Sequence, residues 1–86
     1  MLFEFDPQKS EKNKEKHGIN FVEAQELWRD SGSIGFPANS ESEPRFAVIG
    51  KISGKLWVGF YTLRDGKIRI ISVRRARKGE KILYES

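Results

Sequence analysis

The residues best suited to chemistry lie in the last third of the chain. Arg69 and Arg74 stand near the two ends of a β-branched segment, and Glu80 and Tyr84 follow it. A guanidinium group is a planar fork of donors that stays charged at any working pH, so arginines held by a rigid strand suit a phosphate group. Glu80 and Tyr84 are spaced i, i+4 and would share a helix face, where a carboxylate and a phenol can act as general base or acid. We therefore expect chemistry on a phosphodiester, with an RNA backbone as the target.

Each of these residues also has a purely structural interpretation. The arginines can be solvated strand charges that prevent aggregation. Glu80 can be an exposed charge, and Tyr84 can anchor the end of the chain on the sheet. Because side chains alternate along a strand, Arg69 and Arg74 should lie on opposite faces, unless a bulge or the strand end redirects one of them.

Two more residues are candidates for the same site. His17 is the only histidine, and its type suits protonation of a leaving oxygen, although the C-terminal end of a helix also favours histidine for electrostatic reasons. Arg45 follows Glu43 closely. It either pairs with that carboxylate or enters the cleft of the C-terminal arginines.

Other basic residues are candidates for RNA binding. Arg64 and Lys67 flank a predicted turn beside the arginine-rich strand. Lys9, Lys12 and Lys16 are spaced i, i+3, i+7 and form a basic stripe. Such a stripe is either a solvated face or a surface that steers RNA or docks an acidic partner.

Length and composition restrict the class of protein. A chain of 86 residues is expected to form one domain, spanning 1–86. With 37% hydrophobic and 33% charged residues it is predicted to be globular, and its net charge of +4 favours a nucleic acid or an acidic partner. Neither a membrane span nor a secretory leader is evident. The absence of cysteine excludes disulfides and fits a cytoplasmic protein, and we expect no metal and no cofactor.

The N-terminal quarter predicts a strand and a polar helix. Residues 2–5 alternate loosely and read as a short strand. Asp6 as N-cap and Pro7 in the first turn begin a helix that runs to Lys16, and Gly18 is placed to end it in a left-handed conformation. Because this helix carries no large apolar residue, we expect it to lie outside the core.

A second helix and a loop are predicted next. Asn20 and Glu23 have the spacing of a capping box. The helix that follows has an apolar stripe, formed by Phe21, Ala24, Leu27 and Trp28, and it should end at Asp30–Gly32. Residues 31–44 are rich in Gly, Ser and Pro and predict an exposed loop, with one short strand around 34–36.

The rest of the chain predicts three strands and a short helix. The strands are expected at 45–52, 56–63 and 68–74, with tight turns at Ser53–Gly54 and Asp65–Gly66. Residues 75–84 can form the last helix. The predicted order is β-α-α-β-β-β-α with the one further short strand. This is an α+β domain with an antiparallel sheet of four or five strands and the two N-terminal helices packed on one face.

Motifs along the whole chain resemble the BrnT-type toxins. The first group is Phe5-Asp6-Pro7, Asn13, Lys16-His17-Gly18-Ile19, Phe21, Glu23-Ala24 and Asp30. The second is Glu43, Arg45, Ile49-Gly50, Tyr61-Thr62, Arg69-Ile70-Ile71-Ser72, Arg74, Ala76, Glu80 and Tyr84. Phe5 stands where the family commonly has Trp, and Gly79 weakens the last helix.

The resemblance implies a RelE-like fold and the toxin of a type II toxin–antitoxin pair, a ribonuclease that arrests translation. It also implies a BrnA-like antitoxin with a ribbon-helix-helix domain, two copies of each chain in the complex, and repression of the complex's own promoter. The family-motif positions with reactive side chains are His17, Arg45, Arg69, Ser72, Arg74, Glu80 and Tyr84.

Our hypothesis from the sequence is a metal-independent endoribonuclease. The 2′-hydroxyl attacks the adjacent phosphorus and leaves a 2′,3′-cyclic phosphate. Arg74 and Arg69, with Arg45 as a further candidate, hold the phosphate, and a second group (Glu80, His17 and Tyr84) moves protons or orients the substrate. The alternatives are a non-catalytic basic module that binds RNA or protein, and a degenerate toxin that retains only its antitoxin interface.

Overall fold

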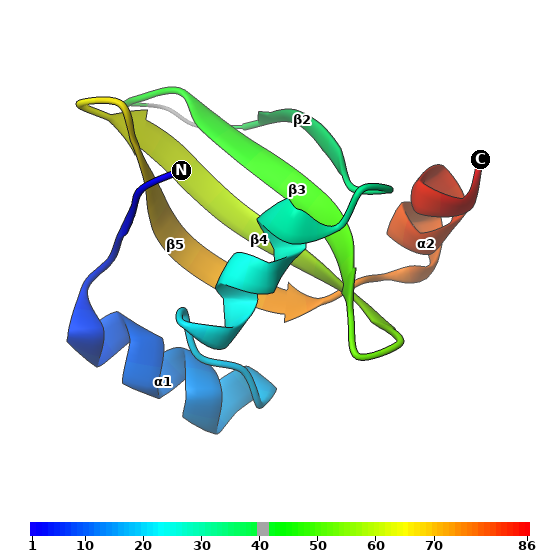
Figure 1. Cartoon of the computed structure of the whole chain (residues 1–86), viewed down its shortest axis with the longest axis horizontal. Helices are drawn as coiled ribbons and strands as arrows, with labels where there is room; N and C mark the ends of the chain where they lie inside the picture. Colours follow the sequence, from blue (N-terminus) through cyan, green and yellow to red (C-terminus); the bar gives the residue numbers. More distant parts are fainter. Residues whose placement is uncertain (40–41) are drawn as a thin grey trace.

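The computed structural model describes residues 1–39 and 42–86, and it confirms the α+β class. One sheet has the strand order β1-β5-β4-β3-β2 (Figure 1). In chain order the elements are β1 (Phe3–Glu4), α1 (Pro7–His17), the 3₁₀ helix η1 (Glu23–Arg29), β2 (Ile34–Ala38), β3 (Arg45–Ile52), β4 (Lys55–Arg64), β5 (Lys67–Arg75) and α2 (Lys78–Glu85). No helix in the described ranges is long and apolar enough to cross a membrane.

The sheet is mixed, so the prediction of a purely antiparallel sheet is wrong. Strands β2 to β5 pair antiparallel in sequence order, but β1 pairs parallel with β5. The sequence pattern of a two-residue strand is too short to predict whether the strand pairs parallel or antiparallel. Both predicted tight turns are confirmed, since Ser53–Gly54 and Asp65–Gly66 each have two consecutive positive φ values.

The second helical segment covers one face of the sheet as a 3₁₀ helix. Its capping box is confirmed: Asn20 Oδ1 accepts from the Glu23 N–H at 2.8 Å, and Glu23 Oε1 accepts from the Asn20 N–H at 2.9 Å. Leu27 lies close to the sheet, because a Cβ atom at Gly50 or Gly59 would come within 3.0 Å of its methyl groups. The core of this face consists of Ile19, Phe21, Ala24, Leu27, Val48, Trp57, Ile68, Ile70 and Val73.

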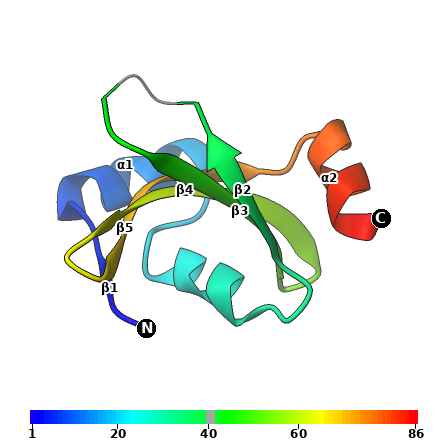
Figure 2. The same ribbon diagram turned by 90° about the horizontal axis from the view of Figure 1, so that it is seen from above.

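Helix α1 lies along the edge of the sheet, beside β5, and not on the same face as η1 (Figure 2). Its Asn13 side chain donates to the carbonyls of Ile19 at 2.8 Å and Val73 at 2.9 Å, and accepts from the Val73 N–H at 3.2 Å. Ser10 Oγ accepts from the Phe21 N–H at 2.9 Å. The helix therefore docks through buried polar groups and satisfies the exposed edge of β5, as an added strand would.

Helix α2 begins three residues later than predicted. Arg75 continues β5 and pairs with Trp57, so the helix cannot start before the connection through Ala76. Figure 1 shows α2 beyond the end of the sheet, far from α1. Within the described residues, the sheet face opposite η1 has no helix across its centre, and α2 contacts it at one end, through Tyr84 and Glu80 (Figure 2). We call this surface the open face.

Candidate functional site

A β-bulge in β5 decides where the C-terminal arginines point. On one side of the bulge Tyr61 pairs with Ile70, and on the other Phe60 pairs with Ser72. Ile71 is therefore an extra residue without a direct partner. A single inserted residue reverses the alternation of side chains beyond it.

Because of the bulge, Arg69 and Arg74 lie on the same face, which is the exception to strict alternation that the sequence analysis named. Ile70 and Val73 both belong to the core under η1, although they are three positions apart, an odd spacing that would put them on opposite faces of a regular strand. Arg69, Ser72 and Arg74 therefore share the open face. This change of periodicity is the structural feature that gathers the candidate side chains.

Arg45 joins the same face from another strand. Phe46 pairs with Tyr61, so Arg45 is level with Thr62 on β4, and Thr62 pairs with Arg69 on β5. The three side chains form one cross-strand row. Since neighbouring strands are about 4.8 Å apart, the Cα atoms of the two arginines are about 10 Å apart, and both side chains can reach one phosphate group.

The surroundings of this row position both arginines. The Thr62 hydroxyl donates to the Pro44 carbonyl at 2.8 Å, which holds the start of β3 where Arg45 stands. Arg69 forms an ion pair of 3.6 Å with Glu4, the next residue in the row, and both side chains are about one third exposed. Arg45 itself is exposed.

The predicted alternative partner of Arg45 is engaged elsewhere. Glu43 forms its ion pair with Arg64, at 3.6 Å. Arg64 and Lys67 are both exposed at the turn between β4 and β5, next to the row of Arg45 and Arg69. They extend the positive charge at this end of the open face.

At the other end of the open face, Glu80 holds Arg74. The two nitrogens of the guanidinium donate to the two carboxylate oxygens at 2.8 and 2.7 Å, and the guanidinium lies 5.2 Å from the centre of the Phe60 ring. Glu80 also accepts from the Arg77 N–H at 2.7 Å and so caps α2. The Arg74 hydrogen bonds lower the pKa of Glu80, while partial burial opposes that shift.

Tyr84 and His17 lie outside this arrangement. The Tyr84 hydroxyl donates to Asp30 Oδ2 at 2.8 Å, and this bond raises the pKa of the phenol. Asp30 also accepts from the Lys51 N–H at 2.7 Å, so Tyr84 ties α2 to the sheet. His17 is the last residue of α1, and no hydrogen bond or ion pair in 1–39 and 42–86 links it to an arginine.

The predicted lysine stripe is exposed on α1, which runs beside the edge of β5. Lys9, Lys12 and Lys16 all face solvent. Lys14, which the sequence did not single out, instead binds both oxygens of Glu23, at 2.8 and 3.0 Å. The stripe is compatible with a solvated surface and with steering of a polyanion.

A cavity of about 330 Å³ lies on the other side of the molecule, between the α1–η1 connection and the turn that joins β3 to β4. Arg45, Arg69 and Arg74 do not line it. In the part of the chain that the structure describes, no group of three or more His, Asp or Glu residues is arranged to hold a metal ion.

Two residues of the open face were missed by the sequence analysis. Thr62 separates the two arginines of the row, and Phe60 lies under Arg74 beside Ser72. Both were assigned to a central strand, and their alternation on β4 could have placed them on the face of Arg45. The bulge at Ile71 was needed to bring the β5 residues to that face.

The comparisons with known proteins give one result. The family described as "Ribonuclease toxin, BrnT, of type II toxin-antitoxin system" matches residues 5–80. No individual curated protein shows a significant match to the chain. The matched range begins directly after β1 and contains α1, η1, strands β2 to β5, and the start of α2 with Glu80. The chain therefore belongs to the BrnT family of ribonuclease toxins of type II toxin–antitoxin systems.

Proposed function

We propose that this chain is a metal-independent endoribonuclease of RelE-like fold whose substrate binds on the open face of the sheet. The observation that carries the proposal is the shared face of Arg45, Arg69, Ser72 and Arg74. The bulge in β5 brings Arg69, Ser72 and Arg74 together on the face where Arg45 lies. Family membership supplies the ribonuclease class.

In the proposed reaction the 2′-oxygen attacks the adjacent phosphorus while the bond from phosphorus to the 5′-oxygen breaks. The products are a 2′,3′-cyclic phosphate and a 5′-hydroxyl. Negative charge accumulates on the non-bridging oxygens in the transition state, and fixed guanidinium groups stabilise it. Arg45 and Arg69 are the first candidates, because their row places them about 10 Å apart at the Cα atoms.

Arg74 and Glu80 have a different role in this proposal. Their bidentate pair holds the guanidinium over Phe60 and fixes the start of α2. Glu80 is ionised, as a general base must be, but its lowered pKa makes it a weak one. His17 was the other candidate for proton transfer from the sequence, but it lies at the end of α1, outside the arrangement on the open face. The proposal therefore predicts that Glu80→Gln slows cleavage more than His17→Ala does.

The non-catalytic alternative has one observation in its favour. Glu4 and Glu80 already occupy Arg69 and Arg74 as ion-pair partners. A phosphate must compete with these carboxylates, which suits a surface that binds polyanions weakly and cleaves nothing. The two functions predict different outcomes when the chain is incubated with RNA: cleavage in one case and binding of intact RNA in the other.

Cleavage of labelled RNA by the purified chain tests the proposal. We expect shorter products with cyclic phosphate ends, formed equally well in EDTA. An RNA band that is retarded but intact would support the binding module instead. Loss of cleavage in EDTA, with the fold retained, would contradict metal independence.

We further propose that the partner is a BrnA-like ribbon-helix-helix antitoxin in a complex of two toxins and two antitoxins, and that the toxin acts in the cytoplasm on translation. Type II systems pair the toxin with a protein antitoxin, which supports the class of partner. Growth arrest on expression of the chain alone, relieved by co-expression of the protein encoded beside it, would be the expected result. A chain that arrests no growth would be a degenerate toxin.

A further inference from the structure

We infer that the cavity on the η1 side of the molecule is a docking site for an acidic segment of the antitoxin, which inserts one apolar side chain into it. The inference rests on the proposed partnership with an antitoxin. It assigns that partner to a surface separate from the proposed RNA site. Its basis is the shape, the lining and the charge of the cavity.

The cavity has apolar walls and a small volume, which limits the size of the group that can occupy it. Ile19, Ile52 and Trp57 form the walls, and the volume is about 330 Å³. This is at the small end of ligand pockets, a size that suits an anchor side chain better than a large cofactor. Figure 1 shows the two backbone segments that enclose it, the α1–η1 connection and the β3–β4 turn, on the same side of the molecule.

The charge around the cavity is positive. Lys55 lines it, and Arg75 lies over the Trp57 ring at 5.3 Å from its centre. Glu23 is the acidic residue of the lining, but Lys14 binds both of its oxygens and lowers the pKa of its carboxyl. The rim therefore favours a partner that brings carboxylates.

A nucleobase fits this cavity poorly. Trp57 is only 9% exposed, and the guanidinium of Arg75 already lies over its ring, so a base cannot stack on it. The remaining walls are aliphatic. An apolar side chain flanked by acidic residues matches both the apolar walls and the positive charge around the cavity. The family belongs to type II toxin–antitoxin systems, whose antitoxin is a protein.

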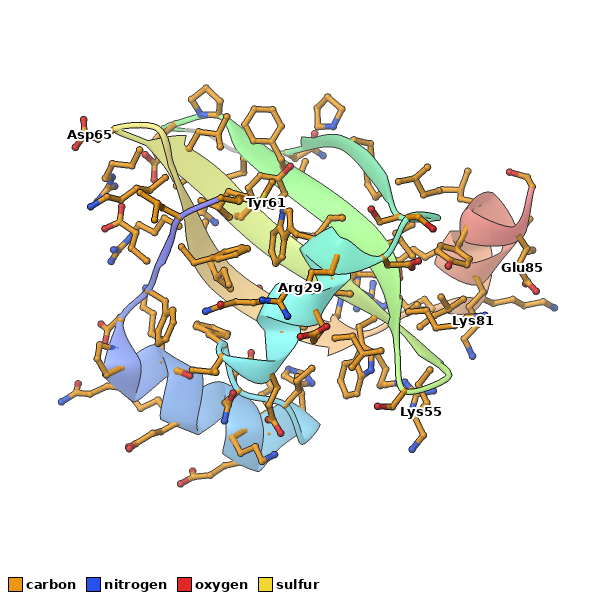
Figure 3. The ribbon with its side chains drawn as sticks, in the orientation of Figure 1. Arg29, Lys55, Tyr61, Asp65, Lys81 and Glu85 are labelled. Atoms are coloured by element: carbon orange, nitrogen blue, oxygen red, sulfur yellow. The ribbon has the colours of Figure 1, made fainter. Side chains whose placement is uncertain are left out.

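Charge reversal at Lys55 and Arg75 tests the inference. Lys55 lies at the β3–β4 turn and lines the cavity, whereas Lys81 lies on α2 and does not line it (Figure 3). Both lysines are exposed, so Lys81→Glu is a matched control for Lys55→Glu. Ser53→Asp is a further variant, because aspartate tolerates the positive φ of 50° at this lining position.

The measurement is titration of each full-length variant with the cognate antitoxin, without RNA. We expect Lys55→Glu combined with Arg75→Glu to weaken binding about 100-fold, Ser53→Asp to weaken it about tenfold, and Lys81→Glu to change it by less than about threefold. Thermal unfolding of each variant confirms that it is folded. Cleavage of RNA by the free double variant should match that of the wild type.

Three results would overturn the inference. Equal antitoxin affinity of Lys55→Glu and Lys81→Glu would show that the cavity is not part of the antitoxin interface. Loss of RNA binding with antitoxin binding retained would make the cavity an RNA subsite. An antitoxin that does not bind the wild-type chain would overturn the proposed partner as well, which the first two results would not do.

Discussion

At the scale of single residues, the site depends on how each arginine is held. Arg74 has two short hydrogen bonds to Glu80 and an aromatic ring beneath it, whereas Arg69 has one longer contact with Glu4 and Arg45 is exposed. A guanidinium that is weakly paired with a carboxylate exchanges that carboxylate for a phosphate more easily than a guanidinium in a bidentate pair does. Arg45 and Arg69 are therefore expected to contribute most to substrate binding.

Replacement of Glu80 by Gln should lower the stability of the protein at neutral pH by about 1 kcal/mol, because it removes a charged pair and weakens a helix cap. The pKa of Glu80 is lowered in the folded state, so its contribution is complete above the ordinary glutamate pKa of about 4.3. As the pH falls through the lower folded pKa, the difference between the two proteins should disappear. Urea unfolding between pH 3 and 7 measures it, and a constant difference would contradict the assignment.

Tyr84 is expected to anchor α2 and to take no part in cleavage. Tyr84→Phe removes the hydroxyl that donates to Asp30 but keeps the ring. The midpoint of thermal unfolding should fall, while the rate of RNA cleavage should stay within about threefold of the wild type. A loss of about 100-fold in kcat with little change in the melting temperature would instead place the phenol in the reaction.

At the scale of elements, local signals in the sequence were reliable where the chemistry is local. The N-cap Asp6, the left-handed Gly18 and the capping box at Asn20 are all confirmed, because each depends on residues only a few positions apart. The parallel pairing of β1 was not predictable in this way. It depends on a strand of two residues and a partner more than sixty positions away.

Two further elements show why tertiary contacts limit prediction. The bulge at Ile71 has no special residue to mark it, since the strand around it is simply rich in isoleucine. Helix α1 has no apolar stripe, yet it docks firmly, because Asn13 satisfies backbone groups of β5 that the sequence alone cannot identify. The candidate residues could be identified from their residue types, but the sequence alone could not show that they lie on one face of the sheet.

Asn13 is expected to be the strongest polar contributor to stability. Asn13→Ala would leave the N–H and C=O of Val73 and the C=O of Ile19 without partners, which should lower the free energy of unfolding by about 2–3 kcal/mol. Lys12→Ala, an exposed change in the same helix, is the matched control and should cost less than about 0.5 kcal/mol. Chemical denaturation compares the two, and similar effects would refute the role of Asn13.

At the scale of the whole molecule, the sheet separates two surfaces. One face carries η1 and the main core, with the basic-rimmed cavity at its border, and the other is the open face with the arginine row (Figure 2). A toxin built in this way can be bound by a protein on one surface and by RNA on the other. The net charge of +4 supports association with a polyanion, but only the placement of the charges indicates where it binds.

The most direct test of this account is cleavage of a labelled RNA by Arg45→Ala, Arg69→Ala and the double variant, with Arg29→Ala as control. Arg29 is exposed on η1, on the covered face, and forms a surface ion pair with Glu26 (Figure 3). Each single variant of the row should lose about 100-fold in kcat/KM, the double variant should lose more, and the control should keep wild-type activity. Wild-type cleavage by the folded double variant would show that the arginine row on the open face is not the catalytic site.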